Sequence, residues 1–241
     1  MKTGPIRPVY LLAGDPGARA RHKVDPALQA ALQGCGARHP AVAYIGTASG
    51  DDASFLAWIA RRLHDAGADT VKLAPLAEHH RDVARAKEII DGADLVFFSG
   101  GDVEEGMRQL DDAGMTGPLR ALARRGRAFC GVSAGSIMLA RQWVRWSDPD
   151  DDATAAVFPC ADIAPLLCDT HAEEDGWSEL KALLQLCPDG TVGYGIPAGL
   201  TLRVPPDGTV EALGGAVHAF MRRRGEVVRI ADVKPQSDYA G

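Results

Sequence analysis

Gly131, Ser133 and Gly135 have the types and spacing of a nucleophile elbow, in the run Gly-Val-Ser-Ala-Gly. A short apolar run precedes this segment, and a helix-compatible run, residues 136–142, follows it. A serine on a sharp strand-to-helix turn presents its hydroxyl above the sheet, near the N-terminus of the next helix. Side chains two positions either side of it would collide, so both positions favour glycine. The pattern predicts that Ser133 is a nucleophile, although it also suits a tight strand–helix junction without chemistry.

A second glycine segment is suited to stabilising negative charge on a reacting oxygen. Residues 99–102, Ser-Gly-Gly-Asp, follow an apolar run and precede a helical pattern. Consecutive glycines let backbone N–H groups approach a substrate oxygen closely. The amides of Gly101 and Ala134 therefore form a candidate two-donor oxyanion hole. A plain tight turn is the alternative interpretation.

A serine nucleophile needs a base, and His171 is the candidate among seven histidines. It follows residues 166–170, which are typical of a strand entering a loop, and precedes the acidic run 172–176. Ligands of α/β proteins bind in loops at the carboxyl ends of strands. A solvated loop histidine with acidic neighbours fits the same position. The other histidines fall in helix, turn or hairpin patterns: His22, His39, His64, His79, His80 and His218.

Apolar strand patterns alternate with helical patterns over the first 140 residues, which predicts a parallel sheet covered by helices on both faces. The predicted strands are 9–13, 41–47, 70–73, 95–98 and 128–132. The predicted helices are 83–90, 103–110, 117–125 and one from a cap at Asp52 or Ser54 to about residue 66.

The second half has a different pattern. Residues 147–152 predict an acidic loop, and residues 176–186 predict a helix. Two antiparallel hairpins are expected at the end, 200–204 with 209–213 and 217–221 with 227–233. No repeat or low-complexity linker is present. We expect one α/β domain over residues 1–241, a three-layer sandwich with a mostly parallel central sheet and antiparallel C-terminal hairpins.

Composition excludes several classes of function. The chain has 241 residues, 46% of them hydrophobic, and a formal net charge of −6. Without a long basic block, nucleic-acid binding is not expected, and the triplet 222–224 suits a solvated hairpin. No run of 18 apolar residues predicts a membrane span, and the N-terminal residues lack the order of a signal peptide.

The cysteines indicate a reducing compartment. Five are present, an odd number without CxxC spacing, which argues against a disulfide framework or a zinc site. They are Cys35, Cys130, Cys160, Cys168 and Cys187. We expect a cytoplasmic protein with no cofactor and no metal.

Three segments together resemble the peptidase E / cyanophycinase type of serine peptidase. They are residues 97–102 (Phe-Phe-Ser-Gly-Gly-Asp), residues 131–136 (Gly-Val-Ser-Ala-Gly-Ser), and an acidic loop followed by His171. Residues 45–49 (Ile-Gly-Thr-Ala-Ser) also resemble that family's second strand. The resemblance covers roughly residues 8–220 and implies a fold similar to class I glutamine amidotransferases.

The resemblance also implies a triad. Carried onto this sequence, it makes Ser133 the nucleophile and His171 the base, and it places the acid best at Asp148, in the loop after the elbow helix. Glu173 is an alternative acid, because amidotransferases carry theirs two residues past the histidine. Residues 150–152, all aspartates, are further candidates.

The sequence departs from the resembled family at two places. Residues 195–199 are apolar where related peptidases often carry acidic or polar residues, and the loop 148–152 is unusually acidic. The resemblance suggests an acidic residue before the scissile bond, which would require a cation in the pocket. Arg141 and Arg145 are close in sequence, although both also suit exposed positions.

We therefore expect a serine hydrolase that cleaves a small peptide or isopeptide bond through an acyl-enzyme, as a monomer or homodimer. One alternative is a catalytically idle protein that binds a small ligand on the same scaffold. Another is a carboxylester hydrolase, although the spacing from Ser133 to His171 is short for an α/β-hydrolase. A cysteine-dependent amidotransferase is disfavoured, because serine occupies the elbow and Cys130 lies within the preceding strand.

Overall fold

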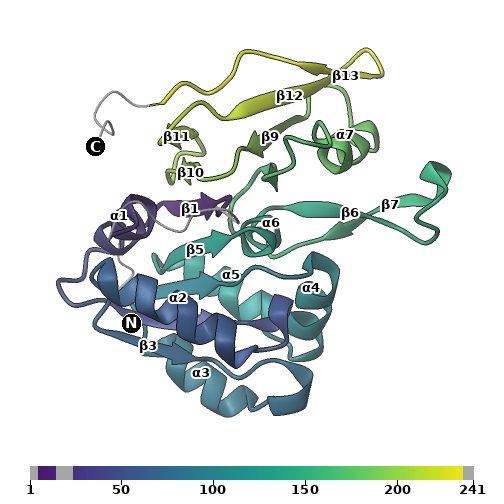
Figure 1. Cartoon of the computed structure of the whole chain (residues 1–241). Coiled ribbons are helices and arrows are strands. Elements are labelled where there is room, and N and C mark those ends of the chain that lie inside the picture. The colour runs from purple at the N-terminus through teal and green to yellow at the C-terminus, as the bar shows by residue number, and fades with distance from the viewer. Residues whose placement is uncertain (1–4, 15–23, 236–241) are drawn as a thin grey trace.

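A seven-stranded sheet forms the centre of the computed structural model, which describes residues 5–14 and 24–235 (Figure 1). The strand order is β11-β10-β1-β5-β4-β2-β3. Five strands are parallel: β1 (Val9–Leu12), β2 (Ala41–Ile45), β3 (Thr70–Leu73), β4 (Leu95–Phe98) and β5 (Ala128–Val132). Two antiparallel strands extend the β1 edge: β10 (Thr201–Val204) and β11 (Glu211–Leu213). The mostly parallel sheet predicted from the sequence is confirmed.

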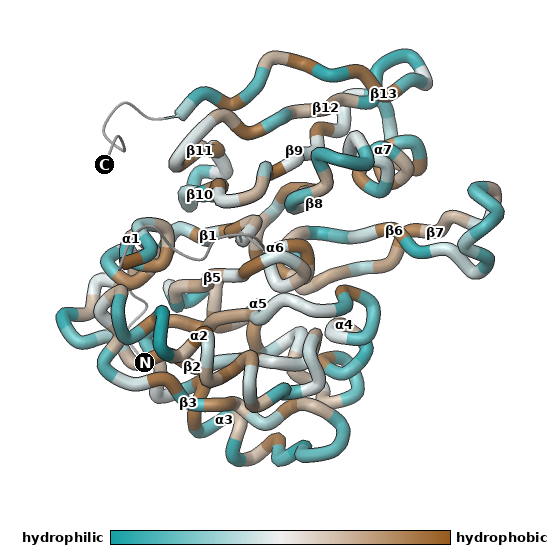
Figure 2. The backbone as a smooth tube through the Cα atoms, in the orientation of Figure 1, coloured by the Kyte–Doolittle hydropathy of each residue, from teal (hydrophilic) through white to brown (hydrophobic). Residues whose placement is uncertain are grey.

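Helices cover both faces of this sheet, because neighbouring side chains of each buried strand point in opposite directions. Phe97 and Phe98 are both fully buried, yet they belong to two separate cores. Phe97 packs on the side of α1 (Pro26–Gly34) and α2 (Ala53–Asp65). The opposite core holds residues of α3 (Val83–Asp91), α4 (Val103–Asp112), α5 (Thr116–Arg124) and α6 (Ala134–Leu139). Figure 2 shows hydrophobic residues concentrated along the central strands.

Aspartate caps set the starts of several helices. The Asp52 carboxylate accepts the N–H of Phe55 at 2.7 Å, so one of the two predicted caps of α2 is confirmed. Asp82 and Asp102 cap α3 and α4 in the same way. Helix α1, which Asp25 caps, was not predicted.

A second sheet of four strands, in the order β13-β12-β9-β8, lies beyond the antiparallel edge (Figure 1). Its strands are β8 (Leu167–Thr170), β9 (Val192–Ile196), β12 (His218–Arg223) and β13 (Glu226–Arg229). Helix α7 (Ser178–Gln185) packs against them. Both predicted C-terminal hairpins form, β10–β11 in the central sheet and β12–β13 in this one.

The prediction of a helix over residues 136–142 is wrong at its end. Helix α6 stops at Leu139, Ala140 is extended, and β6 (Gln142–Trp146) pairs with β7 (Ala155–Pro159) as a projecting hairpin (Figure 1). The side chains of Trp143 and Val144 favour a strand and are buried there. Short 3₁₀ turns complete the elements at Thr47–Ser49, Glu78–His80 and Asp152–Thr154.

Candidate active site

Ser133 occupies a strained turn between β5 and α6. Its backbone has φ 53° and ψ −125°, a combination that costs an L-residue on the order of 1–3 kcal/mol. Two hydrogen bonds hold the turn: the Ser133 N–H donates to the carbonyl of Leu12 at 2.9 Å, and the Ser133 carbonyl accepts from the N–H of Ser136 at 2.8 Å. The turn therefore fixes the serine at the carboxyl edge of the sheet.

Glycines on either side of Ser133 are required by contact. A Cβ added to Gly131 would lie 2.5 Å from the carbonyl carbon of Gly135. A Cβ added to Gly135 would lie 2.3 Å from the carbonyl oxygen of Phe98. These clashes are the ones that a nucleophile elbow predicts for the two glycines.

His171 lies within hydrogen-bond distance of the serine hydroxyl. The distance between Ser133 Oγ and His171 Nε2 is 2.7 Å, although the residues are 38 positions apart. His171 follows β8 directly, and its N–H donates to the carbonyl of Ile196 at 2.9 Å. Its φ of 46° is also unusual for a non-glycine residue. The arrangement places a hydroxyl and an imidazole in contact, as a serine nucleophile and its base require.

The glycine segment after β4 lies against the same serine. Gly101 has φ 140°, and a Cβ there would be 1.9 Å from the carbonyl oxygen of Ala48. The following Asp102 N–H donates to that same carbonyl at 2.8 Å. On the other side, a Cβ on Gly100 would lie 3.3 Å from the Cβ of Ser133. Gly101 and Ala134 both line the pocket that contains Ser133 and His171, so the structure brings four of the predicted residues together.

The two candidate acids are held elsewhere. The Asp148 carboxylate, in the loop joining β6 to β7, accepts the N–H of Asp150 at 3.1 Å. The Glu173 carboxylate accepts the N–H of Ala198 at 2.6 Å, within the apolar segment 195–199. Across residues 5–14 and 24–235, no carboxylate forms a hydrogen bond with the His171 ring. The identity of the orienting acid stays a prediction.

The pocket beside Ser133 has a volume of about 220 Å³ and contains three acidic residues that the sequence analysis did not single out. Asp169 lies on β8, Asp175 in the following turn, and Glu179 in the first turn of α7. Asp169 is only 5% exposed, whereas Asp175 and Glu179 are exposed. A signal was available in the sequence, since Asp169 lies on the predicted strand two positions before His171, which follows the end of that strand.

Burial dominates the charge state of these acids. It raises the pKa of Asp169 to about 7, and the negative charges of Glu179 and Asp175 add to the rise, while the Thr170 amide opposes it. The pKa of Glu179 is also raised, first by partial desolvation of its carboxyl and then by Asp175 and Asp102. The cause in both cases is desolvation, increased by like charges.

The arginines considered as cations for this pocket lie outside its lining. Arg141 pairs with Asp162 at 3.8 Å, and Arg145 pairs with Glu104 at 3.1 Å. The lining residues that the structure describes include no lysine and no arginine.

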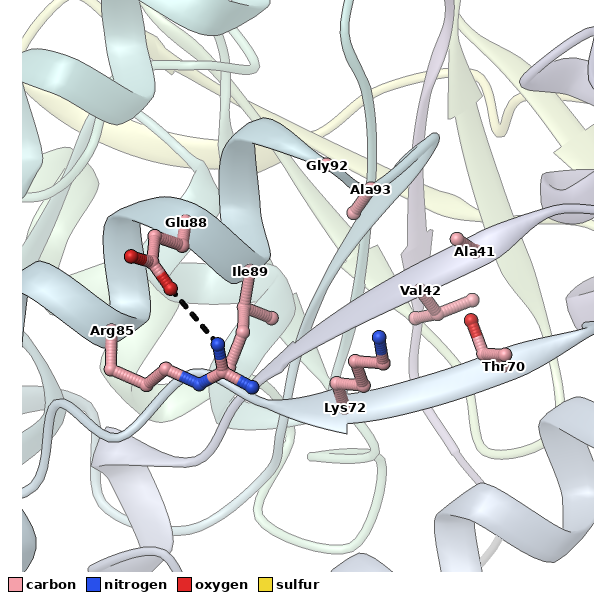
Figure 3. A pocket seen from close by; sticks show the side chains of 9 residues that line it. All are labelled: Ala41, Val42, Thr70, Lys72, Arg85, Glu88, Ile89, Gly92 and Ala93. Atoms are coloured by element: carbon pink, nitrogen blue, oxygen red, sulfur yellow. Dashed lines mark hydrogen bonds and ion pairs between the residues drawn. The ribbon is translucent and has the colours of Figure 1, made fainter.

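A second pocket lies at the opposite ends of the strands (Figure 3). It has a volume of about 110 Å³ and lies between α3 and the starts of β2 and β3. Its polar side chains include the ion pair of Arg85 with Glu88, 2.9 Å apart, and Lys72. No serine, cysteine or histidine lines it in the described part of the chain.

Other chemistries find little support in the described residues. Burial raises the pKa of the Cys130 thiol, which disfavours a thiolate nucleophile next to the elbow. No set of three or more His, Cys, Asp or Glu side chains within residues 5–14 and 24–235 is placed to hold a metal ion. None of the helices in those ranges is long and apolar enough to span a membrane.

Comparisons with known proteins bear on the fold and the family of this chain. Over 93% of its length the chain superposes on 97% of a peptidase from an acI-B1 Actinobacterium, with a TM-score of 0.69 and 19% identity. It also superposes on a putative peptidase E protein from Listeria monocytogenes EGD-e, over 93% of this chain and 98% of that one, with a TM-score of 0.56 and 13% identity. At these identities the likeness establishes the fold. No curated protein sequence matches. The model of Peptidase family S51 matches residues 10–210, and the chain therefore belongs to this family of serine peptidases.

Proposed function

We propose that the protein hydrolyses an amide bond of a small peptide or isopeptide by acyl transfer through Ser133. The observation that carries the proposal is the 2.7 Å contact between Ser133 Oγ and His171 Nε2 at the edge of a pocket. Membership of a serine peptidase family supports amide over ester substrates.

In this mechanism His171 takes the Ser133 proton as the hydroxyl attacks the scissile carbonyl. The amides of Gly101 and Ala134 receive the negative charge that develops on the carbonyl oxygen. His171 then protonates the leaving amine, which departs and leaves an acyl-enzyme on Ser133. Water, deprotonated by His171, hydrolyses this ester and restores the serine.

For the orienting acid we propose Asp148, as the resemblance implies, with Glu173 as the alternative. Glu173 is supported by its place two residues after His171 and by its hydrogen bond to Ala198. Asp148 has no such tie to the site, since its carboxylate bonds within its own loop. Variants of the two acids decide between them.

The experiment that tests the proposal is hydrolysis of a dipeptide panel by wild type, Ser133→Ala and the control Ser147→Ala. The panel includes Asp-X dipeptides, β-Asp-Arg and p-nitrophenyl acetate. We expect Ser133→Ala to abolish peptide cleavage and Ser147→Ala, which removes an exposed hydroxyl from the β6–β7 loop, to retain it. Ester cleavage alone would make the protein an esterase. Binding without Ser133-dependent turnover would make it an idle ligand-binding scaffold.

The Asp-X dipeptides in that panel test the acidic residue before the scissile bond that the resemblance implies. Such a substrate would bring a carboxylate into a pocket whose described lining already holds three acids and no basic side chain. We expect like-charge repulsion to weaken binding of these substrates.

A further inference from the structure

Three carboxylates form a wall of the pocket that contains the Ser133–His171 pair. Asp169 comes from β8, Asp175 from the turn after it, and Glu179 from α7. The Asp175 carboxylate accepts the N–H of Trp177 at 3.0 Å and so is held at the start of the helix. Asp102, at the start of α4, adds a fourth negative charge that acts on Glu179. The wall therefore gathers acidic side chains beside the reacting serine.

Asp169 has a buried oxygen that forms no hydrogen bond with any residue that the structure describes. The residue is 95% buried, and its Oδ1 accepts the N–H of Thr170 at 2.7 Å. Its Oδ2 is buried without a hydrogen-bond partner among the described residues. The amide of Leu180, in the first turn of α7, faces the carboxyl and lowers its pKa but forms no hydrogen bond to it. A buried acceptor without a donor is costly, so a ligand that donates a hydrogen bond to this oxygen would be stabilised here.

Basic side chains near the wall are engaged elsewhere. Lys181, on α7, places its Nζ over the ring of Phe220, 5.6 Å from the centroid. Arg145 is paired with Glu104. The negative charge in the pocket is consequently not neutralised by the described residues that line it.

The acids are not arranged for a metal ion, since no cluster in residues 5–14 and 24–235 meets the geometry for one. A larger organic cation can instead reach carboxylates that are spread along a wall. An ammonium or guanidinium group donates several N–H bonds at once, so its one positive charge can contact more than one carboxylate.

We propose that this pocket binds a positively charged group of the substrate, an ammonium or a guanidinium, between Asp169, Asp175 and Glu179, next to the bond that Ser133 attacks. The inference rests on the proposed hydrolase function and narrows its substrate class. The cation can come from two sources, the free α-amino group of the peptide or the side chain of a lysine or arginine residue. In either case the cation supplies the donor for Asp169 Oδ2 and fixes the carbonyl next to the serine.

Matched substrates separate the two sources. The series is Ala-Ala, which has an α-amino group only, N-acetyl-Lys-Ala, which has a side-chain cation only, and N-acetyl-norleucine-Ala, which has neither. We expect kcat/KM of at least one cationic substrate to exceed that of the neutral one by about tenfold or more, equivalent to ~1.4 kcal/mol. The cationic substrate that gains the advantage identifies the source.

Two variants test whether the wall causes this preference. Asp169→Asn keeps the shape of the side chain and removes its charge, and Asp175→Asn/Glu179→Gln does the same at two exposed positions. We expect each to lower the ratio of cationic to neutral kcat/KM toward one while N-acetyl-norleucine-Ala is still cleaved. Retained cleavage of the neutral substrate shows that the fold and catalysis survive. Glu174→Gln, an exposed acid that does not line the pocket, should leave the ratio unchanged.

A binding measurement keeps the cation site distinguishable from the hydrolase proposal. Isothermal titration calorimetry of Ser133→Ala with alaninamide, N-acetyl-lysine amide and N-acetyl-alanine amide measures the affinity of the pocket for each ligand without turnover. Tighter binding of a cationic amide, lost in Ser133→Ala/Asp169→Asn, supports the inference even where no substrate is hydrolysed. Equal binding of charged and neutral amides, or a cation preference that survives both wall variants, overturns it.

Discussion

Two walls of the pocket that contains Ser133 and His171 differ in charge and in what holds them in place. The nucleophile wall, made by Ser133 and the glycine segment after β4, is uncharged and held by backbone contacts so close that a methyl group does not fit. The carboxylate wall, made by Asp169, Asp175 and Glu179, has side chains whose charges repel one another. The first wall is complete without a ligand, whereas the second leaves a buried oxygen unsatisfied.

This difference shows where each kind of specificity comes from. Steric necessity positions the groups that act on every substrate, because backbone geometry changes little between ligands. On the proposal made above, charge selects among substrates, because a carboxylate stabilises a cationic ligand more than a neutral one. Substitutions on the nucleophile wall should therefore lower the hydrolysis rate or the stability of the fold. Substitutions on the carboxylate wall should change the preference among substrates.

The largest effect is expected where the nucleophile wall meets the base. Ser133→Ala and His171→Ala should each lower kcat by roughly 10⁴-fold or more, and the double variant should be no worse than the single ones, because the two residues act as one unit. Single-turnover and steady-state rates on the best dipeptide measure this. Additive losses in the double variant would mean that the two residues act independently, contrary to their 2.7 Å contact.

Gly101→Ala should be the most damaging substitution to the backbone of the nucleophile wall. The new Cβ would lie 1.9 Å from the Ala48 carbonyl oxygen, so the segment must move and carry its amide away from the pocket. We expect a loss of ~3 kcal/mol or more in unfolding free energy together with loss of hydrolysis.

Gly114→Ala is the matched control for that clash. Gly114 also has a positive φ, 65°, but a Cβ there meets nothing within 4 Å, so only backbone strain of about 1–2 kcal/mol is expected. Urea denaturation of both variants gives the comparison. Similar losses at the two positions would show that φ, and not contact with Ala48, requires the glycine at 101.

The same contrast explains what the sequence could predict. Strands β3, β4 and β5 begin and end at the predicted residues, because each is an apolar run closed by turn residues. The elbow was predictable since Gly131, Ser133 and Gly135 form a short motif in the sequence, although the contact that requires Gly135 is with the distant carbonyl of Phe98. Both predictions depend on residues close together in the chain.

The burial of Asp169 in the carboxylate wall depends on packing between separate elements of the fold, and local sequence patterns do not predict it. An aspartate is ordinarily exposed, and nothing near Asp169 in the sequence shows that α7 and β8 together bury it. The β6–β7 hairpin was missed for a related reason, since Trp143 and Val144 are buried through contacts with distant elements, including Phe158 of the partner strand.

On the carboxylate wall, Asp169→Asn should stabilise the free protein at neutral and higher pH. Burial raises the Asp169 pKa from 3.8 to about 7, so the folded state holds its proton more tightly than the unfolded state. The contribution of this group to stability is fully present below pH 4 and is lost as the pH rises to about 7, at most ~4 kcal/mol. The asparagine side chain does not ionise, so Asp169→Asn does not lose this stability as the pH rises.

Thermal unfolding at pH 5 and pH 8 measures the effect, with Glu174→Gln as an exposed control. The melting temperature of Asp169→Asn relative to wild type should be higher at pH 8 than at pH 5. A variant that is less stable than wild type at pH 8 would show that the carboxylate is already satisfied, for example as a cap for α7, and would count against an unpaired charge on this wall.

The smallest effect is expected at the orienting acid, where the two walls meet around His171. Asp148→Asn and Glu173→Gln keep the side-chain shapes and remove one charge each. Glu173 already binds the amide of Ala198, beside the segment whose Ile196 carbonyl holds the His171 main chain, so its loss should also loosen the base. Because Asp148 bonds within its own loop, it affects catalysis only if that loop moves toward His171 when substrate binds.

We expect substitution of the true orienting acid to lower kcat by about 10- to 100-fold with little change in KM, since this acid fixes the imidazole and does not touch the substrate. The pH profile of kcat should shift in that variant alone, because the acid stabilises the imidazolium. Losses of equal size in both variants would mean that neither carboxylate orients His171 alone, and that the strained main chain at φ 46° contributes to holding the ring.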